Sequence, residues 1–184
     1  MTEIPVLRTA RLVLDAPEPD DRERVIEYCR DPVFERFMVL PWPYQPEHAD
    51  FFLQKLVPEG WAGGSEWTWA LRESDGGPLL GVIGYRAELA DLGYWLGAPH
   101  RGRGLMTEAV TAVLDHVFAA GVPLVNWECM VGNGASASVA RKTGFTYTGT
   151  RPARIPTRDG TFPDAWHAQL RAAEPRAPQP GWPA

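Results

Sequence analysis

The sequence predicts a mixed α/β fold in which a mostly antiparallel central sheet is flanked by helices. Three β-rich runs follow one another between residues 65 and 99, separated by an Asp-Gly-Gly sequence and other turn residues, which is typical of an antiparallel meander. A broad apolar stripe at helical spacing comes next, in residues 105–121, after a short turn. The 184 residues suffice for one compact domain with a full core. We expect this domain to span residues 1–172, before a Pro/Ala-rich tail at 173–184 that frays.

The N-terminal third predicts a strand followed by two helices. Residues 8–17 (RTARLVLDAP) alternate apolar and polar side chains and end in proline, as strands do. In the helical segment that follows, Asp20 is the expected N-cap and Glu23 stands three residues later, in the capping-box position. The stretch LPWPYQP then interrupts regular structure, and residues 47–56 resume helical spacing.

After the meander, helices and strands alternate. Gly121 is a suitable C-terminal cap for the helix with the apolar stripe. We expect a strand at 122–131, a short helix at 136–144 and two late strands at 145–150 and 164–170.

Charge and cysteine usage exclude several functions. Scattered Lys and Arg residues, 18 against 23 Asp and Glu, give no electrostatic footprint for nucleic acid. No apolar run approaches the ~20 residues of a membrane span, and the N-terminus lacks a signal-peptide core, so we expect a cytoplasmic protein without a membrane partner. Cys29 and Cys129 belong to no CxxC or Cys/His cluster, so neither disulfides nor a metal site is expected. A monomer and a homodimer both remain open.

A basic, glycine-rich turn stands directly before the long helix. The start of a helix presents free backbone N–H groups and the positive end of the helix dipole, a geometry that binds phosphate. Gly102 and Gly104 would let the main chain approach a ligand, Arg101 and Arg103 add positive charge, and Thr107 offers a hydroxyl. The turn matches neither a dinucleotide fingerprint nor a P-loop. An ordinary solvated turn is the alternative.

Two longer stretches resemble a known family. The segments ADLGYWLGAPHRGRGLMTEAV and VGNGASASVARKTGF resemble the acetyl-CoA site of the GNAT acetyltransferases, and most of all the branch that acetylates the N-termini of ribosomal proteins. The matching residues are Arg101, Gly104 and Met106 in the first motif, and Asn133, Ser136, Lys142, Gly144 and Phe145 in the second. Met106 departs from the small residue of the superfamily motif. The likeness covers roughly residues 7–170.

The resemblance implies a sheet splayed at the acetyl-CoA strand and names the residues that would hold acetyl-CoA. Residues 101–107 would wrap the pyrophosphate, the strand at 94–96 would pair with the pantetheine arm, and Asn133 would bind this arm from the far side. Lys142 would reach the 3'-phosphate, or is a charge favoured by the helix dipole. The full set is Tyr94, Trp95, Leu96, Arg101, Gly102, Arg103, Gly104, Leu105, Met106, Thr107, Asn133, Ser136 and Lys142.

Acetyl transfer to an amine requires a neutral amine and a protonated leaving thiol. Asp91 stands where many superfamily members carry a glutamate, and would act as the base through water. An ion pair is the other interpretation, with Glu66, Glu88 and Glu128 as alternative bases. Ser136 resembles the serine that the branch places near the sulfur, although it would equally suit a helix N-cap.

The acceptor is a primary amine, either a protein N-terminus or a small molecule, and direct transfer is expected. Tyr147 is a second candidate for the acid. A non-catalytic acyl-CoA-binding module is the alternative function. The aromatic residues that would wall an acceptor cleft, or else pack in the core, are Trp42, Tyr44, Trp67 and Trp69.

Overall fold

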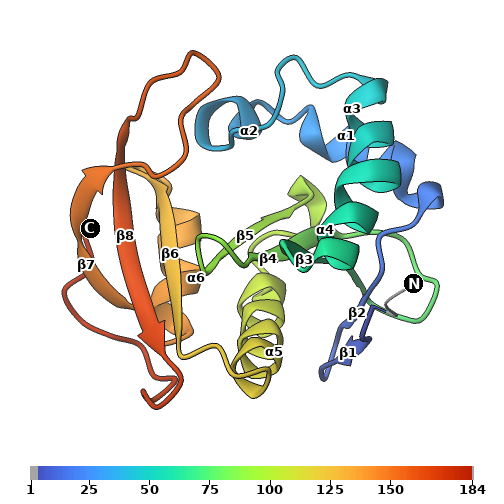
Figure 1. Ribbon diagram of the computed structural model, residues 1–184. Coiled ribbons are helices and arrows are strands. Elements are labelled where there is room, and N and C mark those ends of the chain that lie inside the picture. The colour runs from blue at the N-terminus through green and yellow to red at the C-terminus, as the bar shows by residue number, and fades with distance from the viewer. Residues whose placement is uncertain (1–3, 184) are drawn as a thin grey trace.

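The computed structural model describes residues 4–183 and has one eight-stranded sheet, in the order β1-β2-β3-β4-β5-β6-β8-β7 (Figure 1). All neighbouring strands are antiparallel except β5 and β6. The predicted mixed α/β fold is therefore confirmed. The strands are β1 (Leu7–Arg8), β2 (Val13–Asp15), β3 (Glu66–Arg72), β4 (Gly81–Arg86), β5 (Asp91–Leu96), β6 (Leu124–Met130), β7 (Thr146–Pro152) and β8 (Asp164–Arg171).

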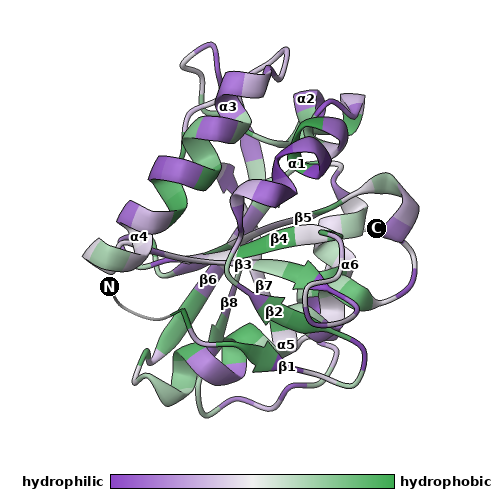
Figure 2. Cartoon of the chain, turned by 90° about the vertical axis from the view of Figure 1, so that its right-hand side faces the viewer, coloured by the Kyte–Doolittle hydropathy of each residue, from purple (hydrophilic) through white to green (hydrophobic). Residues whose placement is uncertain are grey.

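Helices cover both faces of the sheet, as Figure 2 shows in a turned view. The helices α5 and α6 pack on a core that includes Trp69 and Trp127, whereas α1 and α3 pack on a second core that includes Ala70 and Val82. The helical segments are η1 (Pro19–Asp21), α1 (Arg22–Cys29), α2 (Pro32–Phe37), α3 (Pro46–Phe51), η2 (Phe52–Leu56), α4 (Val57–Gly63), η3 (Ala98–His100), α5 (Leu105–Ala119) and α6 (Gly134–Lys142). None of the helices within residues 4–183 has the length and apolar character of a membrane span.

The N-terminal third differs from the prediction in three places. The single strand expected at 8–17 is a hairpin, β1 and β2, paired with Leu7 opposite Leu14. The capping box lies between Glu18 and Asp21, because a 3-10 turn that starts at Pro19 precedes α1. The stretch between the two expected helices contains α2, and the second helix continues through η2 and α4 to Gly63.

The C-terminal tail is packed instead of frayed. The Trp182 ring lies 5.4 Å from that of Trp127 and 5.6 Å from that of Tyr147, measured between ring centroids. Arg176 forms an ion pair with Asp115 of α5. The tail thus contacts β6, β7 and α5.

The strands β5 and β6 pair only at their beginning, where Asp91 stands opposite Asn126. The backbone N–H of Asn126 donates to Ala90 O at 2.6 Å, and its side-chain amide donates to Leu89 O. Beyond this point the two strands diverge, which is the predicted splay. We call the gap between them the wedge. The wedge leaves the backbone edge of β5 free to pair with something other than β6.

Candidate active site

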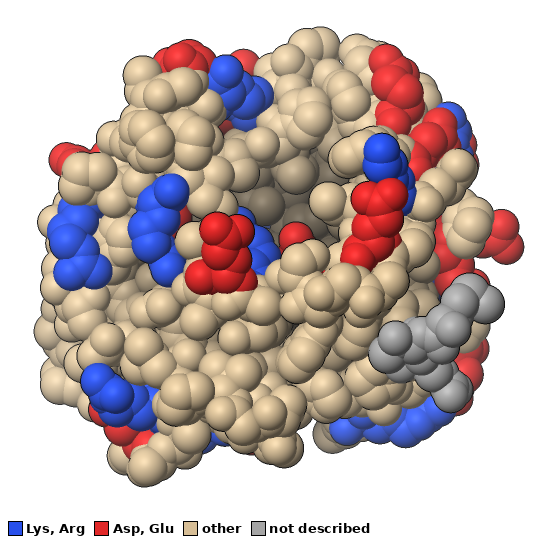
Figure 3. All heavy atoms as spheres, in the orientation of Figure 1, with Lys and Arg blue, Asp and Glu red and all other residues tan. Residues whose placement is uncertain are grey.

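A cavity of 520 Å³ occupies the wedge. Figure 3 shows a deep hollow on this face of the molecule, with side chains of both charges at its rim. Side chains alternate along β6, so Trp127 and Cys129 face the core that contains α5 and α6, while Glu128 and Met130 face the opposite side of the sheet. The cavity lining includes the turn of residues 101–104 and also Glu128, and we call these two regions the glycine-turn end and the Glu128 end.

At the glycine-turn end, the backbone is shaped by two glycines. Gly102 and Gly104 have φ angles of 75° and 76°, in the left-handed region that favours glycine. Gly104 is the N-cap of α5, and a Cβ built at Gly102 would meet no atom within 4 Å. The first turn of the 15-residue helix α5 has N–H groups without intrahelical partners, at the positive end of its dipole. An open, positively polarised cradle of this kind suits a phosphate group.

The two arginines of this turn are engaged with protein groups. Arg101 donates from Nε to Leu96 O at 2.9 Å and from Nη1 to Asp31 at 2.8 Å. Arg103 pairs with Glu73 at 2.6 Å. Both guanidiniums are therefore held by protein groups, while the backbone N–H groups at the start of α5 have no intrahelical partner and are available to a ligand.

Twelve of the thirteen residues expected to hold acetyl-CoA line this cavity. Arg103 is the exception. The twelve are Tyr94, Trp95, Leu96, Arg101, Gly102, Gly104, Leu105, Met106, Thr107, Asn133, Ser136 and Lys142. The structure thus brings together two motifs that lie some 25 residues apart in the sequence.

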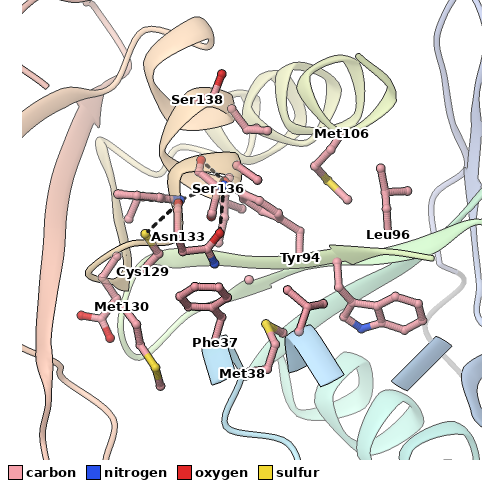
Figure 4. A pocket seen from close by; sticks show the side chains of 18 of the residues that line it. Phe37, Met38, Tyr94, Leu96, Met106, Cys129, Met130, Asn133, Ser136 and Ser138 are labelled. Carbon is pink, nitrogen blue, oxygen red and sulfur yellow. Dashed lines mark hydrogen bonds between the residues drawn. The ribbon is translucent and has the colours of Figure 1, made fainter. Parts of the chain in front are cut away.

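Inside the wedge, the Tyr94 hydroxyl joins β5 to β6 and α6. It accepts from Trp127 Nε1 at 2.9 Å and from Ser136 Oγ at 3.2 Å, and it donates to Ser136 O (Figure 4). Asn133, not Ser136, is the N-cap of α6, and its side chain accepts from the Ser136 N–H. The N-cap interpretation of Ser136 is therefore wrong, and its hydroxyl is directed at Tyr94.

Asp91 is fully buried between two guanidiniums. Its carboxylate accepts from Arg86 at 2.8 and 2.9 Å and from Arg154 at 2.7 Å, and the side chain has 0% exposure. Asp91 does not line the cavity, whereas Arg86 does. This arrangement agrees with the ion-pair interpretation of Asp91.

Glu128 is the one carboxylate among the described residues that lines the cavity. Its Oε2 accepts from Arg154 Nε at 2.9 Å and lies 3.5 Å from His167 Nδ1. Its side chain is 11% exposed. Sequence reasoning treated Glu128 as a secondary candidate and missed Arg154, which comes from the segment after β7 and carries no motif.

The aromatic residues expected to wall an acceptor cleft do not line this cavity. Trp69 is fully buried, Tyr44 belongs to the second core, and Trp67 stacks on Trp61. Within residues 4–183, the aromatic residues that line the cavity are instead Phe34, Phe37, Tyr94, Trp95 and Trp127. The core interpretation holds for Trp67, Trp69 and Tyr44.

Tyr147 also lies outside the cavity lining. Its hydroxyl is 2.9 Å from Thr150 Oγ1, and its ring packs on Trp182. The sequence left Ser136 and Tyr147 as alternative candidates for the acid. The structure distinguishes them, because Ser136 lines the cavity and Tyr147 does not.

The sequence profile of the acetyltransferase (GNAT) domain matches residues 11–146. The chain belongs to the GNAT acetyltransferase family. A ribosomal-protein-serine acetyltransferase of Escherichia coli is 32% identical over 77 residues, which span 39% of this chain and 43% of that enzyme. The chain thus matches less than half the length of this curated GNAT relative.

Solved GNAT structures share the fold. An acetyl transferase from Salmonella typhimurium, which modifies the N-terminal serine of a ribosomal protein, superposes with a TM-score of 0.77 at 18% identity, over 91% of this chain and 99% of that one. A microcin self-immunity acetyltransferase, MccE, in complex with acetyl-CoA and AMP gives a TM-score of 0.74 at 18% identity, over 89% and 93% of the two chains. At these identities the likeness establishes the GNAT fold.

Proposed function

We propose that this GNAT protein is an N-acetyltransferase that moves an acetyl group from acetyl-CoA directly to a primary amine. The observation that carries the proposal is the cavity in the wedge, whose lining includes the glycine-rich turn at the start of α5 and the carboxylate-bearing residue Glu128. Acetyl-CoA would supply the activated acetyl group as a thioester. A cytoplasmic location is part of the proposal.

Backbone groups carry most of the cofactor binding. The N–H groups from Gly102 to Thr107 would hold the pyrophosphate, and the unpaired edge of β5 would bind the pantetheine arm and polarise the thioester carbonyl. Asn133 lines the cavity from the start of α6, and Lys142 from its last turn. The departure at Met106 is compatible with this role, because the cradle consists of main-chain groups.

At the Glu128 end, we assign the proton transfer to Glu128. Its carboxylate faces the cavity, where an amine would approach, while Arg154 fixes its orientation through three hydrogen bonds, one from Nε and two shared by the backbone N–H. Asp91 then acts as a positioning residue that holds Arg86 and Arg154 in place. Ser136 remains the candidate to protonate the leaving thiol, since it lines the cavity beside Tyr94.

The acceptor we favour is an N-terminal α-amine or another weakly basic amine. An α-amine has a pKa near ~8 and is partly neutral in the cell, whereas a lysine near ~10.4 demands a stronger base. The names of the relatives, a ribosomal-protein-serine acetyltransferase among them, support a protein N-terminus. With one carboxylate in the described lining, the cavity offers little to a polycation.

The variant Glu128→Gln tests this assignment. It should lower kcat by about 10²–10⁴-fold, the usual contribution of a positioned base, and leave acetyl-CoA affinity unchanged. Glu88→Gln is the matched control, because Glu88 is exposed and outside the cavity lining. Full activity of Glu128→Gln would remove Glu128 from the mechanism. Acetyl-CoA binding by the wild type without turnover on any amine would favour a non-catalytic acyl-CoA-binding module.

A further inference from the structure

The Glu128 end of the cavity lies between two walls that are far apart in the sequence. One wall is the end of α2, with Phe37, Met38 and Val39, and the other is the loop between β7 and β8, with Ala153 and Ile155. Figure 1 shows this loop rising beside α2, and Figure 4 shows Phe37 and Met38 facing Asn133 and Ser136 across the cavity. The width of this end depends on how the two walls are held together.

Arg158 joins the two walls. From the loop between β7 and β8, its Nη1 donates to Met38 O at 2.8 Å and to Leu40 O at 2.9 Å, and its Nη2 donates to Glu35 O. One guanidinium therefore binds three carbonyl groups of a single segment, residues 35–40. All three are backbone groups, so the contact fixes the path of the main chain.

The helix that Arg158 holds has little stability of its own. The α2 helix has six residues, too few for an isolated helix to persist in water. Its last carbonyls have no intrahelical partner and favour a cation nearby. The other end is fixed independently, since Asp31 caps the Val33 N–H and pairs with Arg101. Loss of Arg158 would release the C-terminal end of α2, where Phe37 and Met38 line the cavity.

We propose that Arg158 is a specificity-determining positioning residue, a clasp that keeps the Glu128 end narrow and limits the acceptor to slender primary amines. An amine whose neighbouring carbon carries a bulky group would have to push Phe37 and Met38 outward, against three hydrogen bonds to backbone carbonyls. The inference rests on the proposed acetyltransferase function for its substrate. The clasp itself rests only on the contacts of Arg158.

The test compares wild type, Arg158→Gln and Arg151→Gln on two peptides that differ only in their first residue, glycine or tryptophan. Arg151 is the matched control because it is an exposed arginine of β7 whose side chain contacts Thr148. Arg158→Gln should raise the ratio of kcat/KM, tryptophan peptide over glycine peptide, by about tenfold. It should leave kcat for the glycine peptide and the affinity for acetyl-CoA near wild-type values. An unchanged ratio would overturn the role in specificity.

Hydrogen exchange separates the clasp from the proposed function. In Arg158→Gln, backbone amides of residues 35–41 and 153–163 should exchange faster than in wild type and in Arg151→Gln. Unchanged exchange in both segments would overturn the clasp, whatever the activity. If wild type acetylates neither peptide while exchange changes as expected, the clasp stands, and the proposed function on peptides fails together with the size limit.

Discussion

The hydroxyl of Tyr94 accepts a hydrogen bond from the indole Nε1 of Trp127 at 2.9 Å, across the gap where β5 and β6 have stopped pairing. The same hydroxyl bonds to Ser136 at the start of α6. Burial raises the pKa of Tyr94, so the phenol stays protonated and keeps donating to Ser136 O. One side chain thus holds two strands and a helix at a fixed separation while the β5 edge stays open for a ligand.

Removing this hydroxyl should destabilise the protein. Tyr94→Phe leaves the Trp127 N–H and Ser136 O without their partner, which we expect to lower the free energy of unfolding by about 1–3 kcal/mol. Tyr147→Phe is the control, because its hydroxyl contacts Thr150 at an exposed position, and surface changes of this kind stay within ~0.5 kcal/mol. Urea unfolding of both variants measures the difference. Equal stabilities would show that Tyr94 does not hold the wedge.

Asp91→Asn distinguishes a positioning residue from a base. It should reduce the free energy of unfolding by roughly 3 kcal/mol, because Arg86 loses the buried carboxylate that it pairs with and Arg154 keeps only its ion pair with Glu128. Asp75→Asn removes an ion pair with Arg8 that lies exposed at the surface, and should leave the free energy of unfolding close to the wild-type value. A variant Asp91→Asn with wild-type stability but no activity would return the role of base to Asp91.

Cys129 should not carry the acetyl group. Burial raises the pKa of its thiol to about 12, so the nucleophilic thiolate is scarce at neutral pH and becomes common only as the pH approaches that value. We expect Cys129→Ala to retain activity. Intact-mass spectrometry after mixing wild type with acetyl-CoA should detect no acetylated protein on the timescale of turnover. A mass increase of one acetyl group that disappears on addition of amine would contradict direct transfer.

Native alkylation provides a second check on the cysteines. Cys29 is also buried, and burial raises its pKa to about 12. Both thiols should react slowly with iodoacetamide at pH 8 in the folded protein and rapidly in urea, where the pKa returns to about 8.5. Fast native labelling of either cysteine would contradict its burial.

Local patterns allowed much of this fold to be predicted. The alternation of the meander and the apolar stripe of α5 depend on neighbouring residues, so they are visible in the sequence. Gly102, Gly104 and the motif from Asn133 to Lys142 were likewise readable, because each feature is contained in one short segment. These segments supplied the glycine-turn end of the cavity.

The Glu128 end could not be predicted in the same way. Arg154 reaches Glu128 across 26 positions and Asp91 across 63, and no spacing rule links such residues before the strands are ordered. The clasp of Arg158 spans about 120 positions. The packed tail was missed for a related reason, since Trp182 docks on Trp127 in a segment whose composition suggests disorder.

The most direct test of the central claim is calorimetric titration of acetyl-CoA into wild type, Gly102→Asp and Gly102→Asn. Both substitutions place a side chain at the same positive φ, where a Cβ meets no neighbour, and Asn and Asp tolerate this conformation alike. They differ in one negative charge beside the proposed pyrophosphate site. The proposed function predicts micromolar binding to wild type, retained in large part by Gly102→Asn and lost in Gly102→Asp. Absence of binding to wild type, or equal binding by the two variants, would contradict it.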